Sequence, residues 1–177
     1  MLLLVIVAAD RRVCDVGVVL WNTQGECVNH GLLRGHKNAV LDLAWSHDGA
    51  YDIDIKLSLS LLGPRTHRFD HLMARRLLSA SADKTAFLWD TQTDERVKKC
   101  SGHTAVVNSC DIIRRGPTLL ASGSDDSTAK LWDVRSKHCV QSLKHGFQVT
   151  SVVFDDSGDQ LITGSIDNVI RVRRTSR

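Results

Sequence analysis

The feature that most constrains the fold is a unit that begins with a Gly-His pair, ends with Trp-Asp and recurs along the chain. Its one uninterrupted copy runs from Gly102 to Asp133. Within it, stretches that alternate apolar and polar residues are separated by turn residues, a pattern that predicts half-buried strands joined by tight turns. Related units occupy about 35–99 and 144–173. We therefore expect one small β unit repeated along the chain.

Four residue types stand in register in these units: a histidine, a serine or threonine, an aspartate and a tryptophan. The sets are His36, Ser79, Asp83 and Trp89; His103, Ser122, Asp126 and Trp132; and His145, Thr163 and Asp167, with Arg173 in the tryptophan position. The pattern resembles WD40 repeats, which implies a β-propeller of four-stranded antiparallel blades. In that family the Asp accepts from the His, the His bonds the hydroxyl, and the hydroxyl meets the indole N–H, because buried polar groups must be paired. We call this set the tetrad.

The third tetrad is expected to be defective. Arg173 leaves the Thr163 hydroxyl without its indole partner and places a cation where an apolar ring packs in the other units. The third blade is therefore predicted to be the weakest.

The expected architecture is all-β: a partial WD40 propeller with about three recognisable blades and part of a fourth. Residues 1–17 form a degenerate N-terminal segment, and 18–177 form the partial propeller with repeats at about 35–99, 102–143 and 144–173. The apolar stretch 1–9 lacks the basic start of a signal peptide, and we interpret it as strand material or a mis-started N-terminus.

An interruption of roughly 25 residues separates the first strand of the unit at 35–99, Val40–Trp45, from its second. The extra residues lie at 51–75. Within them Asp52–Leu61 alternates polar and apolar residues, which predicts a strand. Three interpretations stay open: a β-ribbon projecting from the blade, a disordered loop, or translated non-coding sequence.

Composition describes an ordinary soluble chain, with 42% hydrophobic and 24% charged residues and a net charge of +3. The basic end Arg171–Arg177 is interpreted as solvated. Five cysteines without a Cys-x-x-Cys pair predict reduced, mostly buried thiols in an intracellular protein. We expect no cofactor and no metal site, because the histidines outside the tetrads are scattered; they are His30, His47, His67, His71 and His138.

A Ser-His-Asp set also invites a hydrolase interpretation, which we reject. A catalytic triad is needed once, whereas this set recurs in each unit. We predict that the chain is not an enzyme.

A closer resemblance is carried by several stretches, which include Leu20–Cys27, Asp94–Lys98, Asn108–Cys110, Arg114–Pro117, Gly123–Asp126 and Lys130–Arg135. Asn108–Cys110 and Arg114–Pro117 matter most, because the general repeat does not demand them. Over about 18–49 and 77–172 the chain resembles the WD40 subunits of the U5 small nuclear ribonucleoprotein of the spliceosome. This resemblance implies a nuclear, non-enzymatic scaffold in pre-mRNA splicing that docks the large central splicing factor and other U5 proteins. It implies at most indirect contact with RNA, and no membrane or small-molecule substrate.

The loops between strands are expected to present one face to a protein partner. The residues of this candidate partner-binding face are Lys37, Asn38, Lys84, Thr104, Ser127 and Phe147. We call it the loop face.

Two alternatives remain. Trp132–Arg135 fits the Trp-Asp-x-Arg box of WD40 substrate receptors of cullin-RING ubiquitin ligases, and the chain also suits a generic WD40 scaffold. An unclosed propeller has raw sheet edges, so the polypeptide alone is predicted to be poorly soluble or oligomeric.

Overall fold

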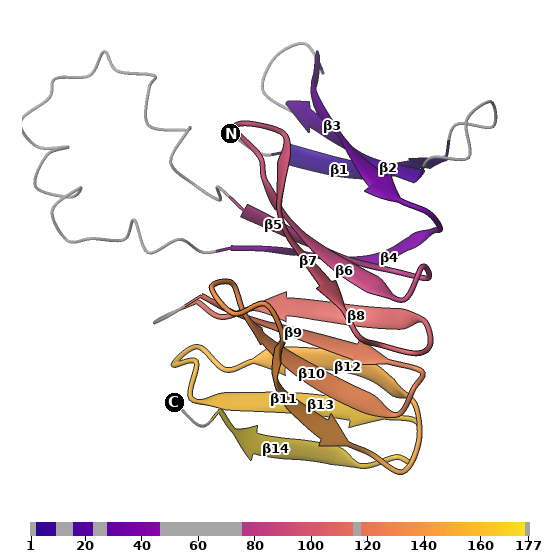
Figure 1. Cartoon of the computed structure of the whole chain (residues 1–177), viewed down its shortest axis with the longest axis vertical. Coiled ribbons are helices and arrows are strands. Elements are labelled where there is room, and N and C mark those ends of the chain that lie inside the picture. Colours follow the sequence, from indigo (N-terminus) through magenta and orange to yellow (C-terminus); the bar gives the residue numbers. More distant parts are fainter. Residues whose placement is uncertain (1–2, 10–15, 23–27, 47–75, 115–117, 176–177) are drawn as a thin grey trace, which may run out of the picture.

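The computed structural model describes residues 3–9, 16–22, 28–46, 76–114 and 118–175. All regular elements in these ranges are strands, and they form four antiparallel sheets stacked along the long axis of the molecule (Figure 1). The predicted all-β, partial propeller architecture is confirmed.

Each sheet is a meander in which strands consecutive in sequence pair with one another. Sheet A contains β1 (Leu3–Ala9), β2 (Val16–Asn22) and β3 (Val28–His36). Sheet B contains β4 (Val40–Trp45), β5 (Arg76–Ser81), β6 (Thr85–Asp90) and β7 (Glu95–Ser101). Sheet C contains β8 (Val107–Ile112), β9 (Leu119–Ser124), β10 (Thr128–Asp133) and β11 (Cys139–Lys144). Sheet D contains β12 (Val149–Phe154), β13 (Gln160–Ser165) and β14 (Ile170–Arg174).

The expectation of four strands in every blade is met in sheets B and C. Sheets A and D have three strands each in the described ranges. In sheet A, the apolar segment Leu3–Ala9 pairs with β2 over its whole length, from Leu3 opposite Asn22 to Ala9 opposite Val16. The apolar start of the chain is thus strand material in sheet A.

Strands β4 and β5 pair directly although many residues separate them in sequence. Trp45 lies opposite Leu77. The ladder ends with two bonds at 2.9 and 3.1 Å: Ser46 N donates to the Arg76 carbonyl, and Arg76 N donates to Ser46 Oγ. The insertion predicted at 51–75, with its three interpretations, lies outside the described residues, as do residues 115–117 and 176–177.

Apolar side chains between neighbouring sheets form three cores, because successive residues of a strand point to opposite faces. Sheets A and B share one that includes Val18, Leu20, Leu33, Phe87 and Trp89. Sheets B and C share one that includes Leu78, Leu88, Ile112, Leu120 and Trp132. Sheets C and D share one that includes Ala121, Leu131, Val152, Phe154 and Leu161. Full burial of such a side chain contributes roughly 1.5–3 kcal/mol, so these cores are the main stabilising contribution.

Sheets C and D approach each other closely at Gly123. A Cβ at this position would lie 2.8 Å from Cγ1 of Val149 and 2.9 Å from Cγ1 of Val152. Both valines are buried, so the glycine allows the two sheets to pack directly.

Polar bonds also join the first strands of sheets B, C and D. Asp42 Oδ2 accepts from Ser109 Oγ and Cys110 N, both at 2.9 Å. Asp111 Oδ2 accepts from Phe154 N at 2.7 Å, and burial raises the pKa of Asp111.

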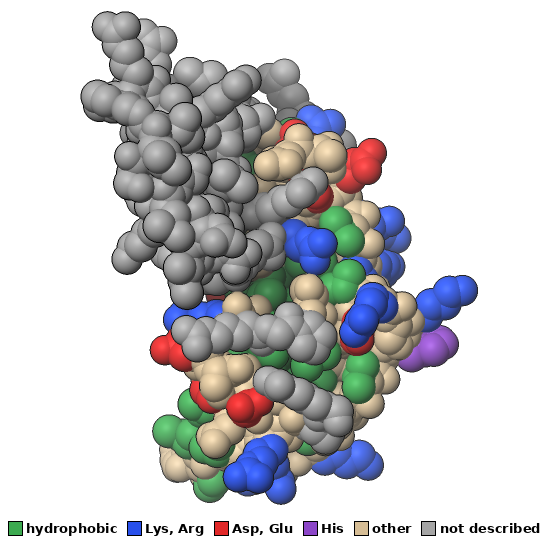
Figure 2. Space-filling model, turned by 90° about the vertical axis from the view of Figure 1, so that its left-hand side faces the viewer, with side chains coloured by type: hydrophobic (Ala, Val, Ile, Leu, Met, Phe, Trp, Pro, Cys, Tyr) green, Lys and Arg blue, Asp and Glu red, His purple; other side chains and the backbone are tan. Residues whose placement is uncertain are grey.

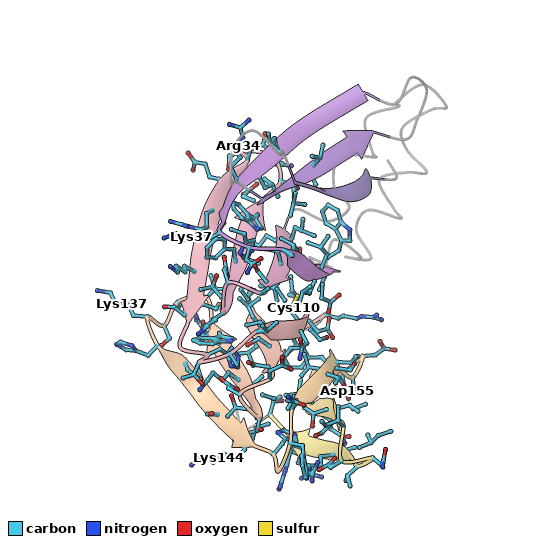
Figure 3. All side chains as sticks on the ribbon, turned by 90° about the vertical axis from the view of Figure 1, so that its right-hand side faces the viewer. Arg34, Lys37, Cys110, Lys137, Lys144 and Asp155 are labelled. Carbon is cyan, nitrogen blue, oxygen red and sulfur yellow. The ribbon has the colours of Figure 1, made fainter. Side chains whose placement is uncertain are left out.

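Asn108 of β8 joins sheet C to sheet D in a second way. Its Nδ2 donates to Asp125 Oδ1 at 2.6 Å and to the Val149 carbonyl at 3.1 Å. Cys110 accordingly lies inside the stack (Figure 3).

Candidate functional site: the tetrads and the loops they hold

The first tetrad is assembled from three strands and one turn of sheets A and B. His36, at the end of β3, places Nδ1 2.8 Å from Asp83 Oδ2 and Nε2 2.7 Å from Ser79 Oγ. The indole N–H of Trp89 donates to the same Ser79 Oγ at 2.9 Å. The His36 ring also stacks on Phe87, with centroids 4.1 Å apart. All four predicted residues therefore meet in one chain of hydrogen bonds.

The second tetrad repeats this geometry within sheet C and the loop before it. His103 Nδ1 lies 2.8 Å from Asp126 Oδ2, and Nε2 lies 2.8 Å from Ser122 Oγ. Trp132 Nε1 donates to Ser122 Oγ at 2.9 Å. Since the indole donates to the hydroxyl, the hydroxyl proton is free to bond His103 Nε2, and Nδ1–H donates to the carboxylate.

The pKa shifts fit a neutral imidazole beside an ionised carboxylate. Burial lowers the pKa of His103 below its ordinary value, although the hydrogen bond and charge of Asp126 oppose this. Burial alone would raise the pKa of Asp126. Hydrogen bonds from Thr128, the Thr104 amide and His103 outweigh that and hold it low. The His36 and Asp83 pair behaves in the same way.

The tetrad hydroxyls are buried, at 0% exposure for Ser79 and 1% for Ser122. Each already accepts an indole N–H and bonds an imidazole. A catalytic nucleophile must be accessible to its substrate. These two hydroxyls are not accessible, and their hydrogen bonds stabilise the fold.

Glycine precedes the histidine in the two complete tetrads for a steric reason. Gly35 and Gly102 have φ of 155° and 147°, which favours a residue without a Cβ. A Cβ at Gly35 would lie 3.3 Å from Cη2 of Trp89, a tight contact, whereas one at Gly102 would lie 3.5 Å from Cη2 of Trp132, an ordinary contact. The backbone conformation is therefore the reason common to both positions, and each glycine lies against the indole of its own tetrad. In the third unit both are absent, since Lys144 and Arg173 replace them.

The third set differs from the expected tetrad in a second way. His145 Nε2 lies 2.9 Å from Thr163 Oγ1, but its Nδ1 faces the Leu143 carbonyl at 3.2 Å. Asp167 Oδ2 is bound instead by Arg171 Nη2 at 2.6 Å. The predicted grouping of Asp167 with His145 is therefore corrected. Arg171, two residues before Arg173 on the same strand, supplies a permanently charged donor that holds the carboxylate.

The neutral histidines predict acid sensitivity. Their folded-state pKa values lie below the unfolded value of about 6.5, so below that pH the unfolded chain binds more protons than the folded one. The contribution of these histidines to the free energy of unfolding should be constant above that pH and fall as the pH drops below it. Urea unfolding at a pH of about 7.5 and about 5.5 measures this. A double variant, His36→Gln with His103→Gln, should show a smaller difference, and equal pH dependence in both proteins would contradict the assignment.

The tetrad aspartates also position the residues of the loop face. Asp83 Oδ2 accepts from Lys37 N at 3.0 Å, and Lys84 follows it with φ of 71°. Asp126 Oδ2 accepts from Thr104 N at 3.0 Å, and Ser127 follows it with φ of 61°. Each pair of loop-face residues is thus brought together around one aspartate.

The remaining loop-face residues lie in the loops that begin at the histidines. The Asn38 carbonyl accepts from Ser81 Oγ at 3.0 Å. The Ser127 carbonyl accepts from His145 N at 2.8 Å, which places the loop carrying Phe147 beside the turn at Ser127. Phe147 is 57% exposed, and Lys37 projects from the surface of the stack (Figure 3).

Sequence reasoning missed several residues that hold these loops. Thr85 and Thr128 each stand two positions after a tetrad aspartate and donate to its Oδ1 from both N and Oγ1. A threonine two positions after the aspartate in both units was the sequence pattern that could have identified them. Lys98 was also missed: its Nζ donates to the Asp133 carbonyl at 2.9 Å and to the Ser136 carbonyl, and so ties β7 to the turn before β11.

The Trp-Asp-x-Arg segment forms a local turn. Arg135 N donates to Asp133 Oδ1 at 2.8 Å, and its exposed guanidinium lies 3.3 Å from Asp133 Oδ2. Across the described part of the chain, no group of three or more His, Cys, Asp or Glu residues is arranged to hold a metal ion. The same part contains no apolar helix of the length needed to cross a membrane.

Comparison with known proteins gives two levels of similarity. The model of the family "WD domain, G-beta repeat" matches residues 25–90, 94–133 and 137–173. Over 158 residues the chain is 42% identical to the U5 small nuclear ribonucleoprotein 40 kDa protein of Dictyostelium discoideum and 32% identical to the pre-mRNA-splicing factor cwf17 of Schizosaccharomyces pombe. These alignments cover 89% of this chain and 38–39% of the relatives.

Two further relatives match shorter parts of the chain, one from the U5 particle and one from another group of WD40 proteins. Over 77 residues the chain is 52% identical to the human U5 small nuclear ribonucleoprotein 40 kDa protein, covering 44% of this chain and 22% of the relative. Over 104 residues it is 38% identical to a guanine nucleotide-binding protein subunit beta of Zea mays, covering 55% and 27%. The family model covers most of the chain, and two complete tetrads and four stacked sheets agree with it. The chain belongs to the WD40 (WD domain, G-beta repeat) family.

Proposed function

We propose that this chain is a non-catalytic scaffold that acts in pre-mRNA splicing in the nucleus, as part of the U5 small nuclear ribonucleoprotein. The observation that carries the proposal is the 42% identity to a U5 protein over 89% of this chain. The chain spans about two fifths of the length of these two relatives. That it binds the partners of a complete U5 protein is therefore also proposed.

The loop face is the proposed partner-binding surface. Its backbone is fixed by bonds to the tetrad aspartates, as at Lys37 and Thr104. A surface held in one conformation pays less entropy on binding, which supports a scaffold role. The proposed partners are the large central splicing factor and other U5 proteins, with RNA contacted at most indirectly.

Affinity capture of the tagged full chain from nuclear extract, followed by mass spectrometry, tests the function. We expect U5 proteins to be recovered, and to remain bound after ribonuclease treatment because the contacts are between proteins. Recovery of a cullin-RING ligase adaptor without splicing proteins would support the substrate-receptor alternative. Recovery of neither class would contradict the splicing proposal and leave a generic scaffold.

A further inference from the structure

Sheet B carries four exposed cations around its first tetrad. Lys37 follows the tetrad histidine and Lys84 follows the tetrad aspartate, so both belong to the loop face. Arg96 and Lys99 lie on the outer strand β7, and all four side chains are exposed. We call these four residues the basic surface. Sheet B packs between sheets A and C, so this surface does not lie at either end of the stack.

The ring of Phe87 brings two of these cations together. Arg96 Cζ lies 4.9 Å from the ring centroid, and Lys99 Nζ lies 5.9 Å from it. The same ring stacks on His36, with centroids 4.1 Å apart. Because the face of an aromatic ring attracts cations, Phe87 holds near one point two side chains that repel each other. Lys and Arg side chains follow one edge of the molecule, at right in Figure 2.

Asp83 places the other two cations beside this pair. Its Oδ2 accepts from Lys37 N at 3.0 Å and lies 2.8 Å from His36 Nδ1, and Lys84 is the next residue in sequence. Burial lowers the pKa of His36, the bond and charge of Asp83 oppose this, and the charges of the two β7 cations lower it further. The four cations therefore surround one histidine and one aspartate.

The basic surface has no carboxylate partner of its own. In the described part of the chain, the ion pairs use Arg114, Arg135, Arg171 and the tetrad histidines, and none of the four cations. The carboxylate of Asp83 is already bonded by the tetrad histidine and by its own turn. Several like charges without counter-charges attract an anionic ligand.

Sheet C shows that the fold does not require these charges. Positions can be matched by their offset from the tetrad residues and by the pairing of the two outer strands. The residues of sheet C that correspond to the basic surface are Thr104, Ser127, Cys139 and Ser142. All four are uncharged. Charges on an edge strand can prevent unwanted pairing, but this explains neither Lys37 nor Lys84, which lie in loops.

We propose that the basic surface binds an acidic segment of a protein partner, whose carboxylates pair with its four cations. Arginine binds a carboxylate through two parallel hydrogen bonds, and complementary charge gives specificity and a fast encounter. Single-stranded nucleic acid suits the site less, because such sites stack bases on aromatic rings and Phe87 is only 2% exposed. This inference rests on the proposal that the loop face binds a protein, and it adds the chemistry of that partner.

Fluorescence anisotropy of a labelled decapeptide of alternating Glu and Gly, titrated with the purified full chain at about 0.1 M ionic strength, tests the inference. Arg96→Glu with Lys99→Glu should weaken binding at least about tenfold, because two attractive charges become repulsive. Lys137→Glu with Arg174→Glu is the matched control. It replaces the same two residue types at exposed positions of sheets C and D, so binding should change less than about threefold.

Two further probes define the chemistry of the ligand. A peptide in which Gln replaces Glu should not bind, and decauridylate should bind more weakly than the acidic peptide. If circular dichroism shows that the β7 variant does not fold, Lys37→Thr with Lys84→Ser takes its place, because sheet C carries these residues in the corresponding loops. This pair should weaken binding at least about threefold.

No binding of the acidic peptide, equal effects of the two double Glu variants, or tighter binding of decauridylate would overturn the inference. The titration uses only the purified chain and synthetic ligands. A failure to capture splicing proteins from nuclear extract would therefore contradict the role in splicing without changing the result of this titration.

Discussion

Replacing Trp132 with alanine is expected to lower the free energy of unfolding by about 3–5 kcal/mol, the usual cost of deleting a buried aromatic side chain. The Trp132 side chain is 2% exposed and lies in the core between sheets B and C. Its loss creates a cavity there and removes the N–H donor from Ser122 Oγ.

Urea unfolding followed by far-ultraviolet circular dichroism, at one protein concentration for all variants, measures this loss. Trp132→Phe is the control, since it keeps an aromatic ring and loses the indole N–H; we expect a cost of about 1–2 kcal/mol from the hydrogen bond and the smaller ring. An alanine variant within about 1 kcal/mol of the wild type would show that this tetrad does not hold the two sheets together.

Asp126→Ala is expected to cost about 3 kcal/mol, because it removes one acceptor from four donors, among them the buried His103 ring. Asp126 accepts from His103 Nδ1 at 2.8 Å, from Thr104 N at 3.0 Å, and from Thr128 N and Oγ1 at 3.0 and 2.6 Å. Its removal should loosen the turn and the loop before β8 together.

Asp156→Ala is the matched control for this variant. Asp156 forms an exposed ion pair with Arg114 at 2.6 Å, and exposed pairs contribute roughly 0–1 kcal/mol. The same urea experiment applies to both. Similar losses in the two variants would indicate that the tetrad aspartate stabilises no more than a surface charge does.

The elements of the fold were largely predictable, because they depend on local patterns. Alternation placed the strand Val40–Trp45 at the bounds of β4. The recurrence of Ser, Asp and Trp at the same spacing after a His identified the residues that meet in the first two tetrads. The number of strands in sheets A and D was not predictable, since it depends on pairing between distant residues, such as Leu3 with Asn22.

Contacts between sheets were the main gap. Asn108, Ser109 and Cys110 were singled out as a mark of resemblance, and the structure shows that they join β8 to neighbouring sheets. Asp42 and Cys110 are 68 positions apart in sequence, so no local period connects them. The Asp167–Arg171 pair was missed for a different reason. The two residues are only four positions apart, but the tetrad pattern predicted His145 as the partner of Asp167.

We propose that the stacked sheets bind splicing proteins through the loop face, and quantitative capture from nuclear extract with matched variants tests this most directly. The wild-type chain should recover U5 proteins. A double variant, Lys37→Glu with Phe147→Ala, should recover at least about fivefold less, because a few exposed anchors carry most binding energy. Val140→Ala should behave as the wild type, because Val140 is exposed near the start of β11, at the opposite end of the strand from His145. The absence of splicing proteins from the wild-type capture, or equal recovery by all three chains, would contradict the account.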